Sequence, residues 1–126
     1  MKLNSISGIN CYVQDLSRTA EFYEALGFRR GKEEPDRLTF YVNWFFVTFI
    51  DQAQEEDAEL RNEAQLPDKG AGLLLYIKVD DVEDFYNGVR SRGMKPVTEP
   101  QARPNRTREF MVRDPDGYKL VFFEKK

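Results

Sequence analysis

The chain of 126 residues contains no histidine and only one cysteine. Histidine is the most common general base and the most common metal ligand, so other side chains would have to fill both roles. A single cysteine cannot form an internal disulfide, which is typical of the cytoplasm. The longest apolar run, 44–50, is broken by Thr48 and is much shorter than the ~20 residues that span a bilayer. The N-terminus also has no apolar segment of the secretory kind, so we expect a cytoplasmic protein without a membrane partner.

The chain also lacks a large excess of positive or negative charge. It has 19 basic and 22 acidic side chains, and its net charge is −3. This balance argues against a general nucleic-acid-binding protein. Aromatic residues, in contrast, are plentiful, with ten Phe, six Tyr and one Trp. That content predicts a folded core, and the length predicts a single domain over residues 1–126.

Two similar cycles of secondary structure follow one another along the chain. In the first, a strand precedes a helix that begins at Asp15 and ends at Gly27; in the second, a strand precedes a helix between Asp81 and Gly93. Both pairs of positions are 66 residues apart, which indicates an internal repeat. The predicted strands are 6–13, 28–32, 37–42 and 44–50 in the first half, and 73–79, 95–98, 107–112 and 118–123 in the second.

Tight turns are expected at Asn43 and at Asp114-Pro115-Asp116-Gly117. The two halves are joined by an acidic linker, residues 53–71. Between positions 51 and 72 there are seven acidic side chains and two basic ones. A short helix over 54–65 is expected there, because its residue types favour helix. The linker is either simply solvated or an electrostatic lip that attracts cations.

Several short motifs occur in order and at characteristic spacing. They are Val13-Gln14-Asp15-Leu16 and Phe22-Tyr23-Glu24-Ala25-Leu26-Gly27-Phe28 in the first half, and Val79-Asp80-Asp81-Val82 and Arg108-Glu109-Phe110-Met111-Val112-Arg113-Asp114-Pro115-Asp116-Gly117 in the second. With the repeat, they resemble the vicinal oxygen chelate superfamily, which includes glyoxalase I, the bleomycin-resistance proteins and extradiol dioxygenases. The resemblance implies an α+β fold of two tandem βαβββ modules, about 1–52 and 72–126. Their curved mixed sheets would face one another around a cavity, with the helices outside. It also implies a homodimer.

Metal-dependent members of that superfamily hold a divalent ion with four His, Glu or Gln side chains. The matching positions here are Gly8, Thr48, Leu74 and Val121. Three of these have no side-chain donor, and Thr48 offers only a neutral hydroxyl. The resemblance therefore implies a metal-free member, to which we assign no metal ligand, no cofactor and no catalytic residue.

Strand alternation predicts which side chains line the cavity, once Gly8 is placed on its inner wall. The predicted ligand-binding residues are Asn10, Tyr12, Tyr41, Trp44, Phe46, Thr48, Leu74, Tyr76, Glu109, Val121 and Phe123. Such a trough suits a small aromatic or cationic organic ligand, through stacking and cation–π attraction. For each aromatic, plain core packing is the alternative. The same alternation places Cys11 under the helix as a buried, inert thiol.

Four arginines, at positions 103, 106, 108 and 113, lie before and within a predicted strand. They are either solvated charges or recognise an anionic ligand group. We favour a metal-independent small-molecule-binding protein, with drug or toxin sequestration as the example that the resemblance offers. The alternatives are a lyase, isomerase or dioxygenase-type enzyme of the same fold, with Glu109 or a tyrosine as base in a cofactor-free reaction, or a ligand sensor.

Overall fold

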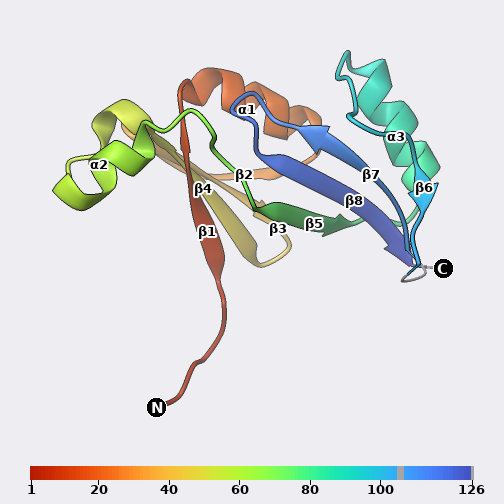
Figure 1. Cartoon of the computed structure of the whole chain (residues 1–126), viewed down its shortest axis with the longest axis horizontal. Helices are drawn as coiled ribbons and strands as arrows, with labels where there is room; N and C mark the ends of the chain where they lie inside the picture. The colour runs from red at the N-terminus through yellow and green to blue at the C-terminus, as the bar shows by residue number, and fades with distance from the viewer. Residues whose placement is uncertain (105–106, 126) are drawn as a thin grey trace. The chain divides into compact units, whose positions relative to one another are not determined.

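A computed structural model describes residues 1–104 and 107–125 (Figure 1). The elements are β1 (Gly8–Val13), α1 (Leu16–Ala25), β2 (Arg29–Glu34), β3 (Arg37–Val42), β4 (Phe45–Asp51), η1 (Gln52–Gln54), α2 (Ala58–Ala64), β5 (Leu74–Lys78), α3 (Val82–Ser91), β6 (Gln101–Ala102), β7 (Thr107–Arg113) and β8 (Lys119–Lys125). The chain divides into unit 1, Met1–Pro67, and unit 2, Asp68–Lys126. Each unit has one four-stranded mixed sheet, which confirms the α+β fold of two βαβββ modules.

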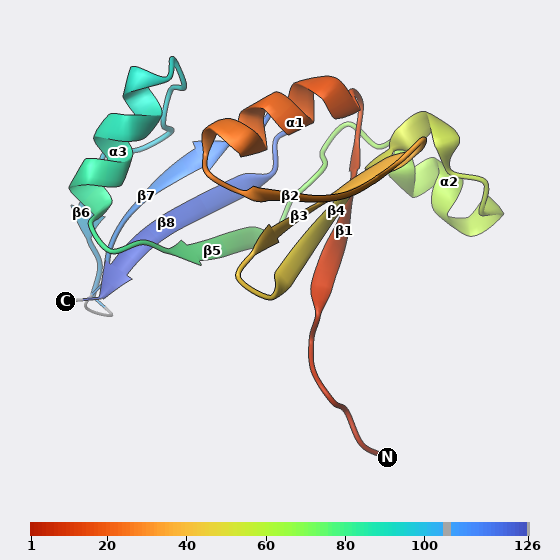
Figure 2. The same ribbon diagram turned by 180° about the vertical axis from the view of Figure 1, so that it is seen from behind.

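In unit 1 the strand order is β1-β4-β3-β2, with β1 parallel to β4 and the other pairs antiparallel. We call this sheet 1. Helix α1 packs on one of its faces (Figure 2). The ring of Tyr23, fully buried, lies 4.9 Å from the ring of Phe28 and 4.5 Å from that of Phe49. This aromatic cluster is the core of the unit.

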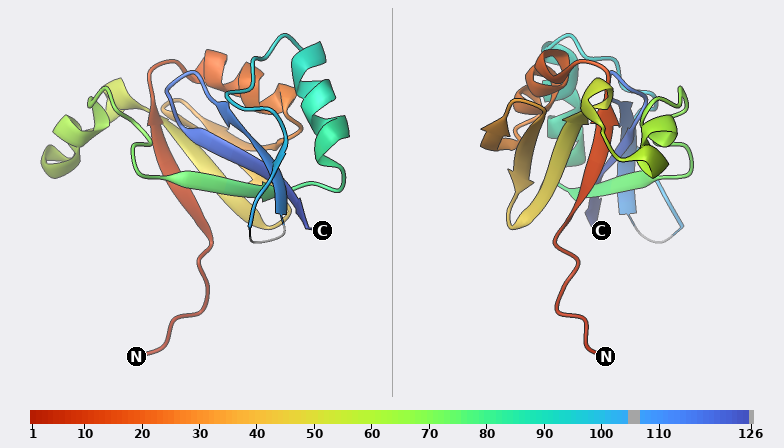
Figure 3. Two further views of the ribbon diagram at one scale, coloured as in Figure 1. Left: turned by 45° about the vertical axis from the view of Figure 1, so that its right-hand side comes forward. Right: turned by 90° about the vertical axis from the view of Figure 1, so that its left-hand side faces the viewer.

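In unit 2 the order is β5-β8-β7-β6, again with the first pair parallel, and we call this sheet 2. Helix α3 covers one face of it (Figure 3). Phe85 lies 4.6 Å from Phe122, and Tyr86 meets Phe110 edge-on at 5.2 Å, measured between ring centroids. The two units thus bury aromatic rings between one helix and one sheet face in the same way.

The ends of α1 and α3 confirm the 66-residue repeat. Asp15 accepts a hydrogen bond from the Arg18 backbone N–H at 3.2 Å, and Asp81 accepts one from the Asp84 backbone N–H at 3.0 Å. Each carboxylate satisfies a backbone donor that has no partner within the first helical turn. Gly27 and Gly93 follow the two helices with φ of +97° and +81°, a conformation that favours glycine.

The predicted strand 95–98 is wrong. In its place the backbone N–H of Val97 donates to the Met111 carbonyl at 2.7 Å, and the Met111 N–H donates to the Thr98 hydroxyl at 3.0 Å. Pro96 lies within this segment and Pro100 two residues after it, and neither has an N–H for a strand ladder. Regular pairing with β7 therefore begins only at β6.

The linker is also more broken than the sequence predicts. The expected helix over 54–65 is replaced by η1 and α2, and Asp57 caps α2 through the Glu59 N–H at 2.9 Å. Between the two, Glu55 has an extended backbone, and the guanidinium of Arg61 donates to the Glu56 carbonyl at 2.8 Å. Among the described residues, no helix has both the length and the apolar character needed to cross a membrane.

Candidate functional site

Each sheet has a second face, opposite α1 or α3, which we call its far face. In β1 and β4, register places Gly8 beside Phe46 and Asn10 beside Thr48 on the far face of sheet 1. Cys11 is buried on the α1 side, as predicted. In β5, Leu74 and Tyr76 are exposed on the far face of sheet 2, at 46% and 51%. The alternation expected from the sequence is therefore present in both units.

Part of the far face of sheet 1 is occupied by its own side chains. A Cβ atom at Gly8 would lie 2.5 Å from the Phe46 ring, so that ring occupies the space beside the glycine. The hydroxyls of Thr39 and Thr48 are 2.7 Å apart, and they satisfy one another. Tyr41 lies under the guanidinium of Arg29, 5.0 Å from its ring centroid.

Two other predicted residues of unit 1 are exposed. Asn10 lies beside Thr48 on the far face but is itself exposed. Trp44 lies in the turn before β4 rather than in the strand, is 69% exposed, and meets Phe45 edge-on at 6.0 Å. Asn43 forms this turn with φ of +57°, as expected.

Tyr12 joins the far face of sheet 1 to the linker, because its hydroxyl donates to the Glu55 carboxylate. Burial, this hydrogen bond and the charges of Glu55, Asp57 and Glu63 raise the pKa of Tyr12 to about 12. The same hydrogen bond lowers the pKa of Glu55. Tyr12 is therefore a neutral donor at physiological pH and a poor candidate for a catalytic base.

The far face of sheet 2 carries a pocket of about 420 Å³, which we call the sheet 2 pocket. Its lining residues are Leu74, Tyr76, Arg103, Pro104, Glu109, Met111 and Val121. Four of these, Leu74, Tyr76, Glu109 and Val121, are predicted from the sequence, and the structure brings them together. Phe123 lies on the same face, 5.7 Å from the Tyr76 ring, without lining the pocket.

One ion pair supplies the polar groups of the sheet 2 pocket. The Arg103 Nε donates to Glu109 Oε1 at 3.1 Å, and the Thr107 hydroxyl donates to Glu109 Oε2 at 3.3 Å. Glu109 is buried, with its side chain 9% exposed, whereas the Arg103 side chain is 44% exposed. The Arg103 backbone N–H also bonds the Thr107 carbonyl at 2.8 Å, which closes the hairpin turn and fixes the position of the arginine.

Two of the three other pocket residues could have been found from signals in the sequence. Met111 alternates with Glu109 on β7, and Arg103 belongs to the four arginines noted above. Of the remaining three, Arg108 turns to the α3 side and pairs with Glu83, Arg113 is exposed at the end of β7, and Arg106 lies outside the described residues. Pro104 comes from the hairpin turn and carried no signal.

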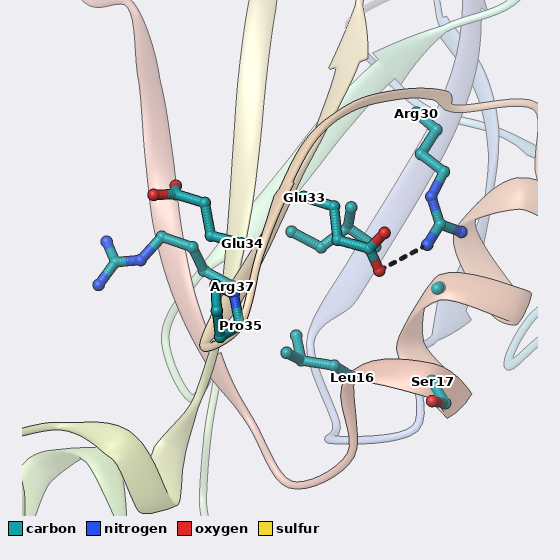
Figure 4. A pocket seen from close by; sticks show the side chains of 9 residues that line it. Leu16, Ser17, Arg30, Glu33, Glu34, Pro35 and Arg37 are labelled. Carbon is teal, nitrogen blue, oxygen red and sulfur yellow. Dashed lines mark hydrogen bonds and ion pairs between the residues drawn. The ribbon is translucent and has the colours of Figure 1, made fainter.

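Unit 1 contains a second pocket, of about 510 Å³, between α1 and the β2–β3 hairpin (Figure 4). Leu16, Ala20 and Leu38 are its apolar lining residues besides Pro35. Arg30 and Glu33 point toward one another at its mouth, with an ion pair of 3.0 Å, and Glu34 and Arg37 point the other way. Because the Arg30–Glu33 pair is largely solvated, with 42% and 66% of the side chains exposed, it offers a ligand little beyond what water offers. The sheet 2 pocket, with its buried carboxylate, is the better candidate.

The residues at the superfamily's metal positions do not fit a divalent ion. In unit 1, Gly8 offers no donor and the space beside it holds the Phe46 ring, while the Thr48 hydroxyl is bonded to Thr39. In unit 2, Leu74 and Val121 are hydrocarbon side chains. Among residues 1–104 and 107–125, no group of three or more His, Cys, Asp or Glu side chains is placed to hold a metal.

The comparisons with known proteins agree with this architecture. Residues 5–122 match the family model described as the glyoxalase/bleomycin resistance protein/dioxygenase superfamily. The chain belongs to this superfamily. The match spans both units, including the helix caps, the turn at Asp114 and the sheet 2 pocket residues.

Several solved structures share the fold at low sequence identity. A glyoxalase/bleomycin resistance protein/dioxygenase from Nocardioides is 20% identical with a TM-score of 0.83, covering 99% of this chain and 85% of that one. A lactoylglutathione lyase from Agrobacterium tumefaciens is 19% identical with a TM-score of 0.75, covering 98% and 96%. A hypothetical protein from S. aureus is 24% identical with a TM-score of 0.78, covering 98% and 95%. No match is found among curated proteins.

Proposed function

We propose that this superfamily member is a metal-independent binding protein for a small organic molecule with an aromatic or other apolar body, held in the sheet 2 pocket. The observation that carries the proposal is the composition of that pocket. It is lined by Leu74, Tyr76, Met111 and Val121, together with an ion pair between the exposed Arg103 and the buried Glu109. Concave apolar sites with few fixed polar groups are typical of small-molecule binding.

The amount of exposed apolar surface supports the proposal. Leu74 and Tyr76 leave about half of their surface uncovered, next to the fully buried Val121. A ligand that covers them gains about 25 cal/mol for each Å² of apolar surface removed from water. The Tyr76 ring also offers a face on which a flat ligand can stack. Drug or toxin sequestration is a function of this kind.

The donor set supports metal independence, because the superfamily's metal positions hold Gly8, Leu74, Val121 and a Thr48 that is already hydrogen-bonded. The enzyme alternative is weaker for two further reasons. Both oxygens of Glu109 accept hydrogen bonds from neighbouring side chains, and Tyr12 is held protonated. We further propose a cytoplasmic protein with no nucleic-acid or membrane partner, since only one cysteine is present and the net charge is −3. A homodimer is proposed from the family resemblance alone.

A thermal-unfolding screen against aromatic antibiotics and other flat organic molecules, with and without Zn²⁺, Mn²⁺, Ni²⁺, Fe²⁺ and Mg²⁺, tests the proposal. A ligand at 100 times its Kd adds about 2.7 kcal/mol to the free energy of unfolding. We expect at least one aromatic compound to raise the Tm and the metals alone to leave it unchanged. Mass spectrometry of the recovered compound then separates binding from turnover.

Tyr76→Ala is the variant that locates the effect, and Trp44→Ala is its matched control. Each removes one exposed aromatic side chain, from the sheet 2 pocket and from the turn before β4 respectively. The Tm shift should be lost in the first and kept in the second. A metal-dependent shift, or conversion of the compound, would favour the enzyme instead.

A further inference from the structure

We propose that the ligand of the sheet 2 pocket is an organic anion, a carboxylate carried on an aromatic or apolar body, and that Arg103 binds the carboxylate. This inference rests on the proposed function and adds the charge of the ligand. From the sequence, a small aromatic or cationic ligand is expected, because aromatic rings attract cations and acidic groups lie in the linker. The contacts within unit 2 favour the opposite charge.

The hydrogen bond to Glu109 uses only part of the Arg103 guanidinium. Its Nε donates to Glu109 at 3.1 Å, and its two terminal amino groups have no partner among the residues that the structure describes. A guanidinium held by Nε keeps a planar pair of donors on its outer side, which matches the two oxygens of a carboxylate. The hairpin bond from the Arg103 N–H to Thr107 holds the backbone of this residue in place.

A ligand that enters the sheet 2 pocket meets the charge of Arg103 before that of Glu109. Arg103 is the outer member of the pair, since 44% of its side chain is exposed against 9% for Glu109. A cationic ligand would have to displace Arg103 from a carboxylate that also accepts a hydrogen bond from Thr107. An anionic ligand needs no such exchange, because Arg103 keeps its bond to Glu109 while its outer donors bind the carboxylate.

The charged side chains on the far face of sheet 2 are mostly basic. Register places on this face the basic side chains of Lys78, Lys119, Lys125 and Arg113, in addition to Arg103 at the hairpin turn. Glu109 is the one acidic side chain that the described strands contribute to it. The surrounding field therefore favours an anion, and it partly offsets the neutralisation of Arg103 by Glu109.

Three naphthalene probes with the same body test the charge: 2-naphthoate, the neutral 2-naphthalenemethanol and the cationic 2-naphthylmethylamine. Fluorescence anisotropy of the naphthyl group gives each Kd, and the NMR signal of the Met111 methyl group reports binding in the pocket. Because Glu109 already neutralises Arg103, we expect a preference for naphthoate over the alcohol of about 10-fold, which is 1.4 kcal/mol.

Arg103→Gln should abolish that preference and change the Kd of the alcohol by less than about twofold, because the apolar lining is intact. Arg108→Gln is the matched control, since it removes an arginine of the neighbouring strand β7 that pairs with Glu83 on the α3 side. Its preference for naphthoate should equal that of the wild type. Unfolding curves of both variants confirm that they are folded.

The outcomes separate this inference from the proposed function. Equal affinity for naphthoate and the alcohol, with Met111 shifts from both, overturns the anion and leaves the binding function in place. Tightest binding of the amine overturns it in favour of Glu109 as the ligand contact. An equal loss in Arg103→Gln and Arg108→Gln overturns the role of Arg103. If none of the three probes binds, the proposed function itself fails, and the inference fails with it.

Discussion

In unit 1 the first strand begins at Gly8, and in unit 2 the position 66 residues later is Leu74. The glycine admits the Phe46 ring, so its own module fills that part of the far face. The leucine is 46% exposed and lines a pocket with Tyr76 and Val121. The polar pairs differ as well: two neutral hydroxyls in sheet 1, and a guanidinium with a carboxylate in sheet 2. One repeated fold thus has an occupied space beside its first strand in one unit and an open pocket in the other.

The largest expected effects concern the aromatic core that both units share. Phe40 on β3 and Phe110 on β7 are both fully buried against their helices. Phe40→Ala and Phe110→Ala should each lower the free energy of unfolding by about 3–5 kcal/mol, because each leaves a large cavity. Denaturant unfolding measures both. A difference of more than about 2 kcal/mol between them would show that the two cores are not equivalent, and the milder Phe→Leu changes would check this if either variant fails to fold.

The next comparison replaces the first residue of β1 and the first residue of β5 with alanine. Gly8→Ala should destabilise the protein by about 1–3 kcal/mol, since the new methyl group meets the Phe46 ring and backbone. Leu74→Ala should cost less than about 1 kcal/mol, because nearly half of that side chain is exposed. Urea unfolding of the two variants measures this. Equal costs would contradict an occupied space at Gly8 and an open one at Leu74.

A double-mutant cycle tests the hydroxyl pair of sheet 1. Thr39→Val leaves the buried Thr48 hydroxyl without its partner and should cost about 1 kcal/mol. The double variant, with valine at both positions, should cost less than the sum of the single changes, because no hydroxyl is left unpaired. Strict additivity in the unfolding free energies would show that the two hydroxyls are not coupled.

The smallest expected effect is the pH dependence that Tyr12 contributes. Its pKa is raised to about 12 from a usual value of 10, so the folded protein holds this proton more tightly than the unfolded chain. The stabilisation is fully present below pH 10 and is lost as the pH rises toward 12. Tyr12→Phe should therefore show a shallower fall of the urea midpoint between pH 10 and 12 than the wild type. Parallel curves would contradict the contact with Glu55.

Much of the fold could be predicted from local signals. The caps at Asp15 and Asp81, the turn at Asn43 and the alternation that buries Cys11 are short-range patterns with direct physical causes. The expected strand 95–98 failed because alternation ignores proline: Pro96 and Pro100 remove donors that a strand needs. The expected linker helix failed in the same way, since Asp57 caps a new helix where the composition favours a continuous one.

The candidate site was predicted only in part, for reasons that involve contacts distant along the chain. Leu74, Tyr76, Glu109 and Val121 follow from strand faces, and they do line one pocket. What alternation cannot show is that Phe46 fills the space beside Gly8, or that Arg103 pairs with Glu109, six positions later in the chain. These contacts depend on hairpin geometry and side-chain size, which determine whether a face is filled or open.

Binding at the sheet 2 pocket is tested most directly by titrating the ¹⁵N-labelled protein with 2-naphthoate. The backbone amide NMR signals of both units are monitored during the titration. We expect saturable shifts at Tyr76, Met111 and Val121 of the sheet 2 pocket. We expect no comparable shifts at Phe46 and Thr48, because the Phe46 ring occupies the space beside Gly8 and the Thr48 hydroxyl is bonded to Thr39. Shifts confined to the residues of sheet 1, or no saturable shift at all, would contradict it.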